Sequence, residues 1–225
     1  MNRLFLIRHG GSTGNEDASF YDYNDSALCL TTNGIRQALS TGGVLKDIDP
    51  SWAKPGNFNL EIYVSEYFRA NQTARIVLDQ MGLLSATPKM TPFLNERNYG
   101  TTYLPVMDED ASFSGNASES GVSARDRAKR FLLSIEHLLD RADLMFFSHY
   151  GAIRAMIAEI MGLSNEAMMQ IDVPNGRAFQ FNRALGADGR WTYCEQELPE
   201  HVLPKSAPPI APLEPFSFRW NHLKR

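Results

Sequence analysis

Short apolar runs alternate with amphipathic segments along most of the chain. Three runs of five residues have the length and apolar character of buried strands: 3–7 (RLFLI), 60–64 (LEIYV) and 144–148 (LMFFS). Each run is followed by a segment whose apolar residues recur at helical spacing. This repeated strand–helix order predicts an α/β fold, a three-layer sandwich in which a mainly parallel central sheet is flanked by helices on both faces.

Four helices are predicted from the apolar spacing. Thr31 and Thr32 can cap the first helix, and the second begins after Ser65 as its N-cap and stops at Gly82. The third is long and amphipathic, and the last is closed by Gly162. Their inward-facing residues, in chain order, are Ile35, Ala38, Leu39 and Leu45; Ala70, Ala74, Val77, Leu78 and Met81; Ala124, Ala128, Phe131, Leu132, Ile135 and Leu139; and Ile153, Met156, Ile157, Ile160 and Met161.

The rest of the chain is less regular. Residues 92–121 are rich in Asn, Ser, Gly and acidic side chains, which indicates a loop. Two later stretches, 177–182 and 191–196, flank a turn and predict a hairpin at the edge of the sheet. The tail over 199–225 has six prolines and no periodicity, which is typical of an extended segment. We therefore expect one folded domain over 1–198 and a separate proline-rich tail.

Composition narrows the classes of function. The chain has 225 residues, 43% of them apolar and 21% charged, as in a soluble globular protein. A net charge of −4 provides no basic field for nucleic acid or an anionic membrane, and no apolar run is long enough to span a bilayer. The run LFLI is too short for a signal peptide, and Cys29 and Cys194 lack metal-binding spacing. These features predict a cytoplasmic protein with reduced thiols.

Polar residues follow each of the three predicted strands. Arg8 and His9 come directly after the first, Arg69 falls in the first helical turn after the second, and His149 follows the third. Because ligands of open α/β sheets bind at the carboxyl ends of the strands, we expect these side chains to converge on one pocket. Two arginines, two histidines and the N-termini of nearby helices indicate an anion site, above all for phosphate.

The same residue types indicate a reaction. A neutral histidine can act as a nucleophile, and neighbouring arginines disfavour its protonated form. The leaving alkoxide then needs a proton, and Glu96 in the loop stretch LNERNYG (94–100) is the best candidate acid. A metal-dependent hydrolase with His9, His149 and Glu96 as ligands is the weaker interpretation, since two arginines would repel a divalent cation.

Six segments, in order along the chain, resemble the histidine phosphatase superfamily, also called the phosphoglycerate-mutase-like family, whose signature is Arg-His-Gly after the first strand. They are RHGGSTGN (8–15), LTTNGIRQA (30–38), VSEYFRANQTA (64–74), LNERNYG (94–100), ESGVSARDR (119–127) and SHYGAIRAM (148–156). The resemblance covers residues 3–162, and it implies that the domain over 1–198 is catalytic.

The resemblance also implies a role for each matching residue and a family that uses neither metal nor organic cofactor. The set comprises His9 as the phosphorylated nucleophile, Glu96 as the proton donor, and Arg8, Arg69, His149, Asn15 and Ser12 around the phosphoryl group. The chain departs from the family at Gly11, where an acidic residue is common, at Tyr150, where a small residue is common, and at Ser118, where glycine is usual.

The leading hypothesis is therefore a metal-independent phosphomonoester hydrolase acting through phosphohistidine on a small phosphorylated substrate, with no nucleic acid or membrane partner. A cofactor-dependent phosphoglycerate mutase needs the same pocket. It is the second choice because the segment between Tyr99 and the helix near Ser123 is short, whereas mutases carry a longer insertion there. An inactive relative that binds phosphorylated ligands is the third. The substrate stays open, and so does a homodimer formed through the tail.

Overall fold

The computed structural model describes residues 3–20, 25–54, 56, 59–100, 112, 118–139, 141–183 and 191–193. At its centre is a six-stranded sheet in the order β3-β2-β4-β1-β5-β6. The strands are β1 (Arg3–Arg8), β2 (Leu60–Val64), β3 (Lys89–Met90), β4 (Asp143–Ser148), β5 (Ala178–Arg183) and β6 (Trp191–Tyr193). The first four run parallel, whereas β5 pairs antiparallel with β1, and β6 antiparallel with β5. The predicted parallel sheet with a hairpin at its edge is confirmed.

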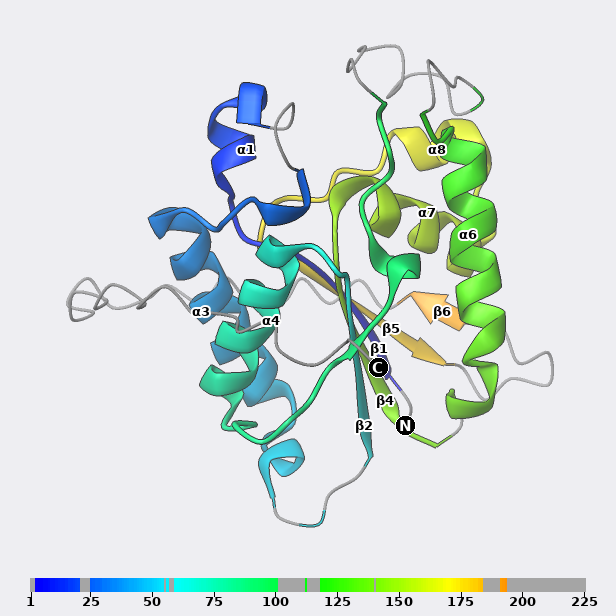
Figure 1. The fold of residues 1–225 in the computed structure, drawn as a ribbon. Helices are drawn as coiled ribbons and strands as arrows, with labels where there is room; N and C mark the ends of the chain where they lie inside the picture. Colours follow the sequence, from blue (N-terminus) through cyan, green and yellow to red (C-terminus); the bar gives the residue numbers. More distant parts are fainter. Residues whose placement is uncertain are drawn as a thin grey trace, which may run out of the picture.

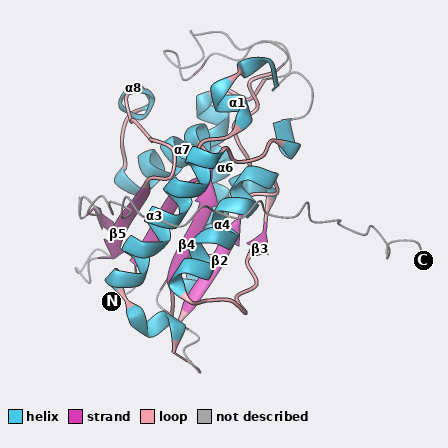
Figure 2. Ribbon diagram, turned by 90° about the vertical axis from the view of Figure 1, so that its left-hand side faces the viewer, coloured by secondary structure: helices cyan, strands magenta, loops and turns pink. Residues whose placement is uncertain are grey.

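Helices cover both faces of this sheet (Figure 1). One face carries α3 (Thr32–Ile48) and α4 (Phe68–Met81), and the other carries α6 (Gly121–Ser134) and α7 (Tyr150–Met161). Figure 2, turned by 90°, shows α3 and α4 in front of the strands. Two short helices, α1 (Thr13–Glu16) and α8 (Asn165–Met169), lie beyond the carboxyl ends of the central strands. The predicted three-layer sandwich is therefore confirmed.

The central strands direct alternate side chains into two separate cores. Leu4 and Leu6 of β1 pack in the core under α6 and α7, whereas Phe5 and Ile7 pack in the core under α3 and α4. All six residues of β4 are buried, as expected for a parallel strand covered on both faces. The strands that lead to the candidate site are therefore packed on both faces.

Several predicted helix ends are confirmed. Thr31 is the N-cap of α3, where its side chain accepts a hydrogen bond from the backbone N–H of Gly34. Gly82 and Gly162 follow the last residues of α4 and α7 in the left-handed conformation, with φ of 83° and 64°. Glycine adopts that conformation without steric cost, so it terminates both helices.

Three predictions about the helices are wrong. The N-cap of α4 is Tyr67 and not Ser65, because Ser65 is buried at the end of β2, where other side chains engage its hydroxyl. The long helix α6 ends at Ser134, and a 3₁₀ turn over 136–138 replaces its predicted last turn. Met161 is 38% exposed and not buried, because it is the final residue of α7.

Other predictions fall on residues outside the described ranges. They concern Cys194, the tail over 199–225 and most of the loop over 92–121. Cys29 is described, and its thiol is free and exposed. None of the helices in the described part of the chain is both long enough and apolar enough to cross a membrane.

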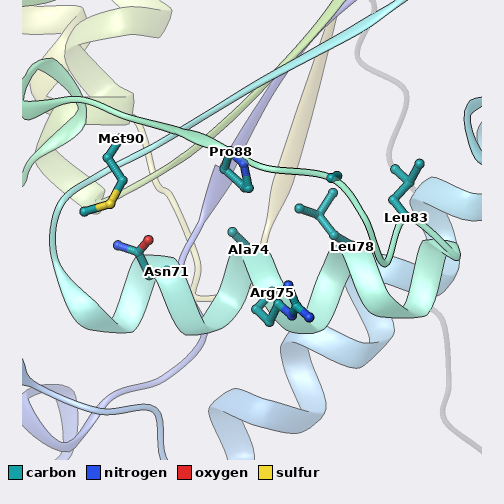
Figure 3. Close-up of a pocket in the computed structure, with 8 residues that line it drawn as sticks. Asn71, Ala74, Arg75, Leu78, Leu83, Pro88 and Met90 are labelled. Atoms are coloured by element: carbon teal, nitrogen blue, oxygen red, sulfur yellow. The ribbon is translucent and has the colours of Figure 1, made fainter. Parts of the chain in front are cut away.

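A small apolar groove lies between α4 and the segment that leads into the edge strand β3. Its volume is about 190 Å³, and Figure 3 shows Ala74 and Leu78 on the helix facing Pro88 and Leu83 across it. None of the residues assigned to the active site from the sequence lines this groove. It is a surface feature of the α4 layer and not part of the site at the strand ends.

Candidate active site

The strand register brings the two predicted histidines together. Arg8 of β1 pairs with Ser148 of the neighbouring parallel strand β4, so the residues that follow, His9 and His149, leave the sheet side by side. Their ring centroids are 5.0 Å apart. Arg69, in the first turn of α4, reaches the same point and donates a hydrogen bond from Nε to Nε2 of His9 at 3.2 Å. These three side chains are almost fully buried.

Hydrogen bonds determine which nitrogen of His9 carries the proton. Nδ1 lies 2.7 Å from the carbonyl oxygen of Gly10, which can only accept, so Nδ1 holds the proton. Nε2 therefore keeps its lone pair, which accepts from Arg69. Burial, with the charges of Arg69 and Arg8, holds the pKa of His9 well below its ordinary value. The side chain is neutral at physiological pH, with Nε2 available as a nucleophile.

His149 is oriented through Ser65, a residue not recognised as part of the site from the sequence. The Ser65 hydroxyl donates to Oδ1 of Asn95 at 2.9 Å, and its oxygen lies 2.7 Å from Nε2 of His149. Asn95 cannot be flipped, because the backbone N–H of Glu66 donates to Oδ1 and Nδ2 donates to the Glu66 carboxylate. Since its proton goes to Asn95, Ser65 accepts from His149, whose Nε2 is therefore protonated.

This arrangement leaves Nδ1 of His149 without a proton. That nitrogen is buried and has no hydrogen-bond partner among the described residues. Burial, with the nearby charge of Arg69, holds the pKa of His149 well below its ordinary value, so the free ring is neutral. Nδ1 can accept the proton of a phosphate monoanion and then donate a hydrogen bond to a phosphoryl oxygen.

Glu96 is held against the first turn of α7. Its Oε1 accepts hydrogen bonds from the backbone N–H groups of Arg97 at 2.7 Å and Gly151 at 2.9 Å. A Cβ at Gly151 would lie 2.9 Å from this oxygen, so only glycine allows the close approach. Burial raises the pKa of Glu96 above its ordinary value, which favours the protonated carboxylic acid.

Arg8 is fixed by contacts on two sides. It donates from Nη1 to the carbonyl of Val173, and its guanidinium carbon lies 5.0 Å from the centre of the Tyr150 ring. The other neighbour of that ring is Arg154, at 4.7 Å. Tyr150, unusual for the family at this position, thus stacks on Arg8. Arg154 is buried and donates from Nε to the carbonyl of Met168.

Asn15 and Ser12 lie at the short helix α1. Oδ1 of Asn15 accepts from both the backbone N–H and the hydroxyl of Ser12, each at 3.0 Å. Nδ2 of Asn175 connects them to His9, because it lies 3.2 Å from Oδ1 of Asn15 and 3.2 Å from the carbonyl oxygen of His9. Ser12 therefore orients the Asn15 side chain, and the Asn175 side chain lies between Asn15 and His9.

Ser65, Asp25 and Asn175 are the site residues that sequence reasoning missed. Ser65 is predicted from the sequence as a helix N-cap and not as part of the site. Asp25 lies in an irregular stretch, and its carboxylate forms an ion pair with Arg69 at 2.8 Å. Asn175 belongs to a Pro-Asn-Gly sequence, which by itself predicts only a turn. Within the described ranges, no group of three or more His, Cys, Asp or Glu side chains is arranged to hold a metal ion.

Comparison with known proteins places this geometry in context. A family model described as Histidine phosphatase superfamily (branch 1) matches residues 4–186. A 2,3-bisphosphoglycerate-dependent phosphoglycerate mutase from Bartonella henselae is 30% identical over 190 residues, which cover 77% of this chain and 88% of that protein. Adenosylcobalamin/alpha-ribazole phosphatase from Escherichia coli is 29% identical over 189 residues, 77% of this chain and 86% of the relative. A solved structure of a phosphoserine phosphatase mutant from Entamoeba histolytica, in complex with phosphoserine, superimposes with a TM-score of 0.68 at 19% identity and covers 90% of this chain and 100% of that one.

Proposed function

The chain belongs to the histidine phosphatase superfamily, and from this premise we propose that it hydrolyses phosphomonoesters through a phosphohistidine intermediate on His9. The observation that carries the proposal is the state of His9. Its Nδ1 proton is bound to the Gly10 carbonyl, and the lone pair on Nε2 lies beside Arg69. A buried, neutral imidazole next to guanidinium groups suits attack on a phosphoryl group.

In the first step, Nε2 of His9 attacks phosphorus and the bond from phosphorus to the ester oxygen breaks. Arg8 and Arg69 balance the negative charge on the non-bridging phosphoryl oxygens, and protonated His149 donates to one of them. Glu96 gives its proton to the departing oxygen, so the product leaves as a neutral alcohol. Phosphohistidine and the Glu96 carboxylate remain.

In the second step, a water molecule attacks the phosphohistidine. The Glu96 carboxylate takes the proton from this water, the N–P bond breaks, and inorganic phosphate is released. His9 regains its lone pair on Nε2. Its Nδ1 stays protonated throughout and donates a hydrogen bond to the Gly10 carbonyl. Glu96 is protonated again, and His149 returns its Nδ1 proton to the departing phosphate, which restores the starting state.

Phosphoglycerate mutase activity is the second candidate, because the relative from Bartonella henselae carries that name. A mutase returns the phosphoryl group from histidine to the bound product, whereas a phosphatase gives it to water. The phosphatase is preferred because the segment between Tyr99 and the helix near Ser123 is short. A relative of comparable identity is named a phosphatase.

The test is release of phosphate from an aryl phosphate at mildly acidic pH in the presence of EDTA. The wild type is expected to be active, and His9→Ala is expected to lose all measurable turnover while remaining folded. Bisphosphoglycerate-dependent interconversion of phosphoglycerates is measured in parallel. If phosphoglycerates are interconverted faster than phosphate is released, the protein is a mutase and not a phosphatase. Equal activity of the wild type and His9→Ala would contradict both.

A further inference from the structure

The carboxylate of Asp25 contacts Arg69, the arginine that we propose binds the phosphoryl group. Asp25 is the first residue of the 3₁₀ helix η2 (Asp25–Ala27), and its Oδ1 lies 2.8 Å from Nη1 of Arg69. The same nitrogen donates a hydrogen bond to the backbone carbonyl of Asp25 at 2.6 Å. Two contacts from one residue to one guanidinium nitrogen hold this carboxylate in place beside the catalytic histidines.

Asp25 and His9 contact different nitrogens of Arg69. The Nε atom of Arg69 faces Nε2 of His9 at 3.2 Å, whereas Nη1 is bound to Asp25. A phosphoryl group transferred to His9 therefore meets Nε and need not displace the carboxylate. The Asp25 carboxylate thus places a negative charge one guanidinium group away from His9.

The Asp25 side chain is more exposed than the site residues beside it. His9, Arg69 and His149 are at most 2% exposed, whereas the side chain of Asp25 is 33% exposed. Burial is the main cause of the raised pKa of Glu96, and the charge of Asp25 adds to it. Glu96 acts at the ester oxygen, so the alcohol part of the substrate occupies the region that the Asp25 charge reaches.

Two further arginines near the site are already engaged. Arg127 forms two hydrogen bonds of 2.8 Å with the Glu119 carboxylate, and it also donates to the carbonyl of Phe93. Arg97 donates from Nε to the carbonyl of Glu119. Within the described part of the site, these two arginines therefore have acceptors of their own, whereas the Asp25 carboxylate stays partly exposed.

We propose that Asp25 determines substrate specificity by excluding phosphomonoesters whose alcohol part carries a second anionic group near the ester. The favoured substrates are phosphate esters of neutral polyols or of amino alcohols, whose hydroxyl or ammonium groups can donate to the carboxylate. Specificity of this kind comes from a repulsive element as well as from new contacts. The inference rests on the proposed phosphatase function and adds to it the chemical class of the substrate.

Two substrates with the same three-carbon skeleton test this inference. Glycerol 3-phosphate has a neutral diol, and 3-phosphoglycerate has a carboxylate in place of one terminal hydroxymethyl group. The wild type is expected to favour glycerol 3-phosphate in kcat/KM, and Asp25→Asn is expected to reduce that preference by about tenfold through faster hydrolysis of 3-phosphoglycerate. Because both esters depend on Arg69 alike, the ratio cancels any general effect of the substitution on phosphate binding.

The matched control is Asp17→Asn, which removes the same charge from an exposed residue of the same segment. It is expected to leave the ratio unchanged. A wild-type preference for 3-phosphoglycerate would overturn the inference. So would an unchanged ratio in Asp25→Asn, since that makes Asp25 a structural partner of Arg69 only.

The same ratio can be measured without turnover. In the His9→Ala background, which cannot form phosphohistidine, calorimetry gives the dissociation constants of the two esters with and without Asp25→Asn. A shift of about tenfold in their ratio supports the inference, and no shift overturns it. Failure of the wild type to release phosphate from any ester would contradict the proposed function, while these binding constants would still decide the role of Asp25.

Discussion

At the scale of single residues, the proposed catalysis depends on how burial shifts the pKa values of His9 and Glu96. Burial lowers the pKa of His9 and raises that of Glu96, because a poorly solvated site disfavours the charged form of each. The imidazole is thereby kept as a nucleophile, and the carboxylic acid keeps a proton to give. The shift of each pKa therefore favours the protonation state that the proposed reaction needs.

Glu96→Gln is expected to slow hydrolysis of an alkyl phosphate by about 100-fold, because the amide cannot protonate the departing alkoxide. An aryl phosphate with a good leaving group needs little protonation in the first step, so transfer to His9 is expected to stay within a few-fold. The measurement is the amplitude and rate of the leaving-group burst under pre-steady-state conditions. Equal loss of transfer rate from both esters would show that Glu96 is not the proton donor.

The same residue determines a pH dependence. Glu96 loses its proton as pH rises through its raised pKa, so the rate of transfer from an alkyl phosphate is expected to fall on the alkaline side. His9 stays neutral on the acidic side, because its pKa is lowered well below the ordinary value. Each profile is corrected for the second pKa of its own phosphate ester, and the ratio of the alkyl to the aryl profile then cancels enzyme ionisations that affect both esters alike. The alkaline fall in this ratio should disappear in Glu96→Gln, and its persistence there would assign it to another group.

At the scale of elements, the start of α3 supports the loop that carries the nucleophile. A Cβ at Gly34 would lie only 1.9 Å from the carbonyl oxygen of Gly11, and one at Gly10 would lie 2.2 Å from the carbonyl oxygen of Gly34. Helix and loop therefore meet backbone to backbone. The position of His9 depends on a helix that begins more than twenty residues later in the chain.

Gly34→Ala is expected to push this loop away from α3, at a cost of about 1–3 kcal/mol in the free energy of unfolding. Because His9 then loses its position against Arg69, kcat/KM is expected to fall by about 100-fold. Gly11→Ala is the matched control, since its Cβ would have ordinary contacts of 3.6 Å with Gln37 and Thr31. Chemical denaturation and steady-state kinetics of the two variants check this. Similar losses in both would refute the role of the helix–loop contact.

The main elements were predictable because each has a strong local signal. The apolar run over 144–148 has almost the bounds of β4, and Thr31 and Gly162 cap helices where the sequence places them. Predictions failed where tertiary contacts override local preference. Ser65 has the composition of an N-cap, but its hydroxyl is engaged by Asn95 and His149, and the helix begins later.

At the scale of the whole molecule, the difference between regular elements and irregular segments explains which site residues could be predicted from the sequence. Arg8, His9 and His149 stand at the ends of strands, so the rule for parallel sheets brings them together from sequence alone. Asp25 reaches Arg69 only through the folded path of an irregular segment, which no periodicity describes. The site residues placed by regular elements were therefore predictable from the sequence, and the Asp25–Arg69 contact made by an irregular segment was not.

The covalent intermediate is the central claim, and trapping it is the most direct test. Wild-type protein is mixed with an aryl phosphate, quenched in alkali within the first turnovers, and digested for peptide mass spectrometry. One phosphoryl group is expected on the peptide that contains His9, formed in a burst together with the leaving group and absent from His9→Ala. Normal turnover with no covalent phosphate, or with phosphate on another residue, would contradict catalysis by His9.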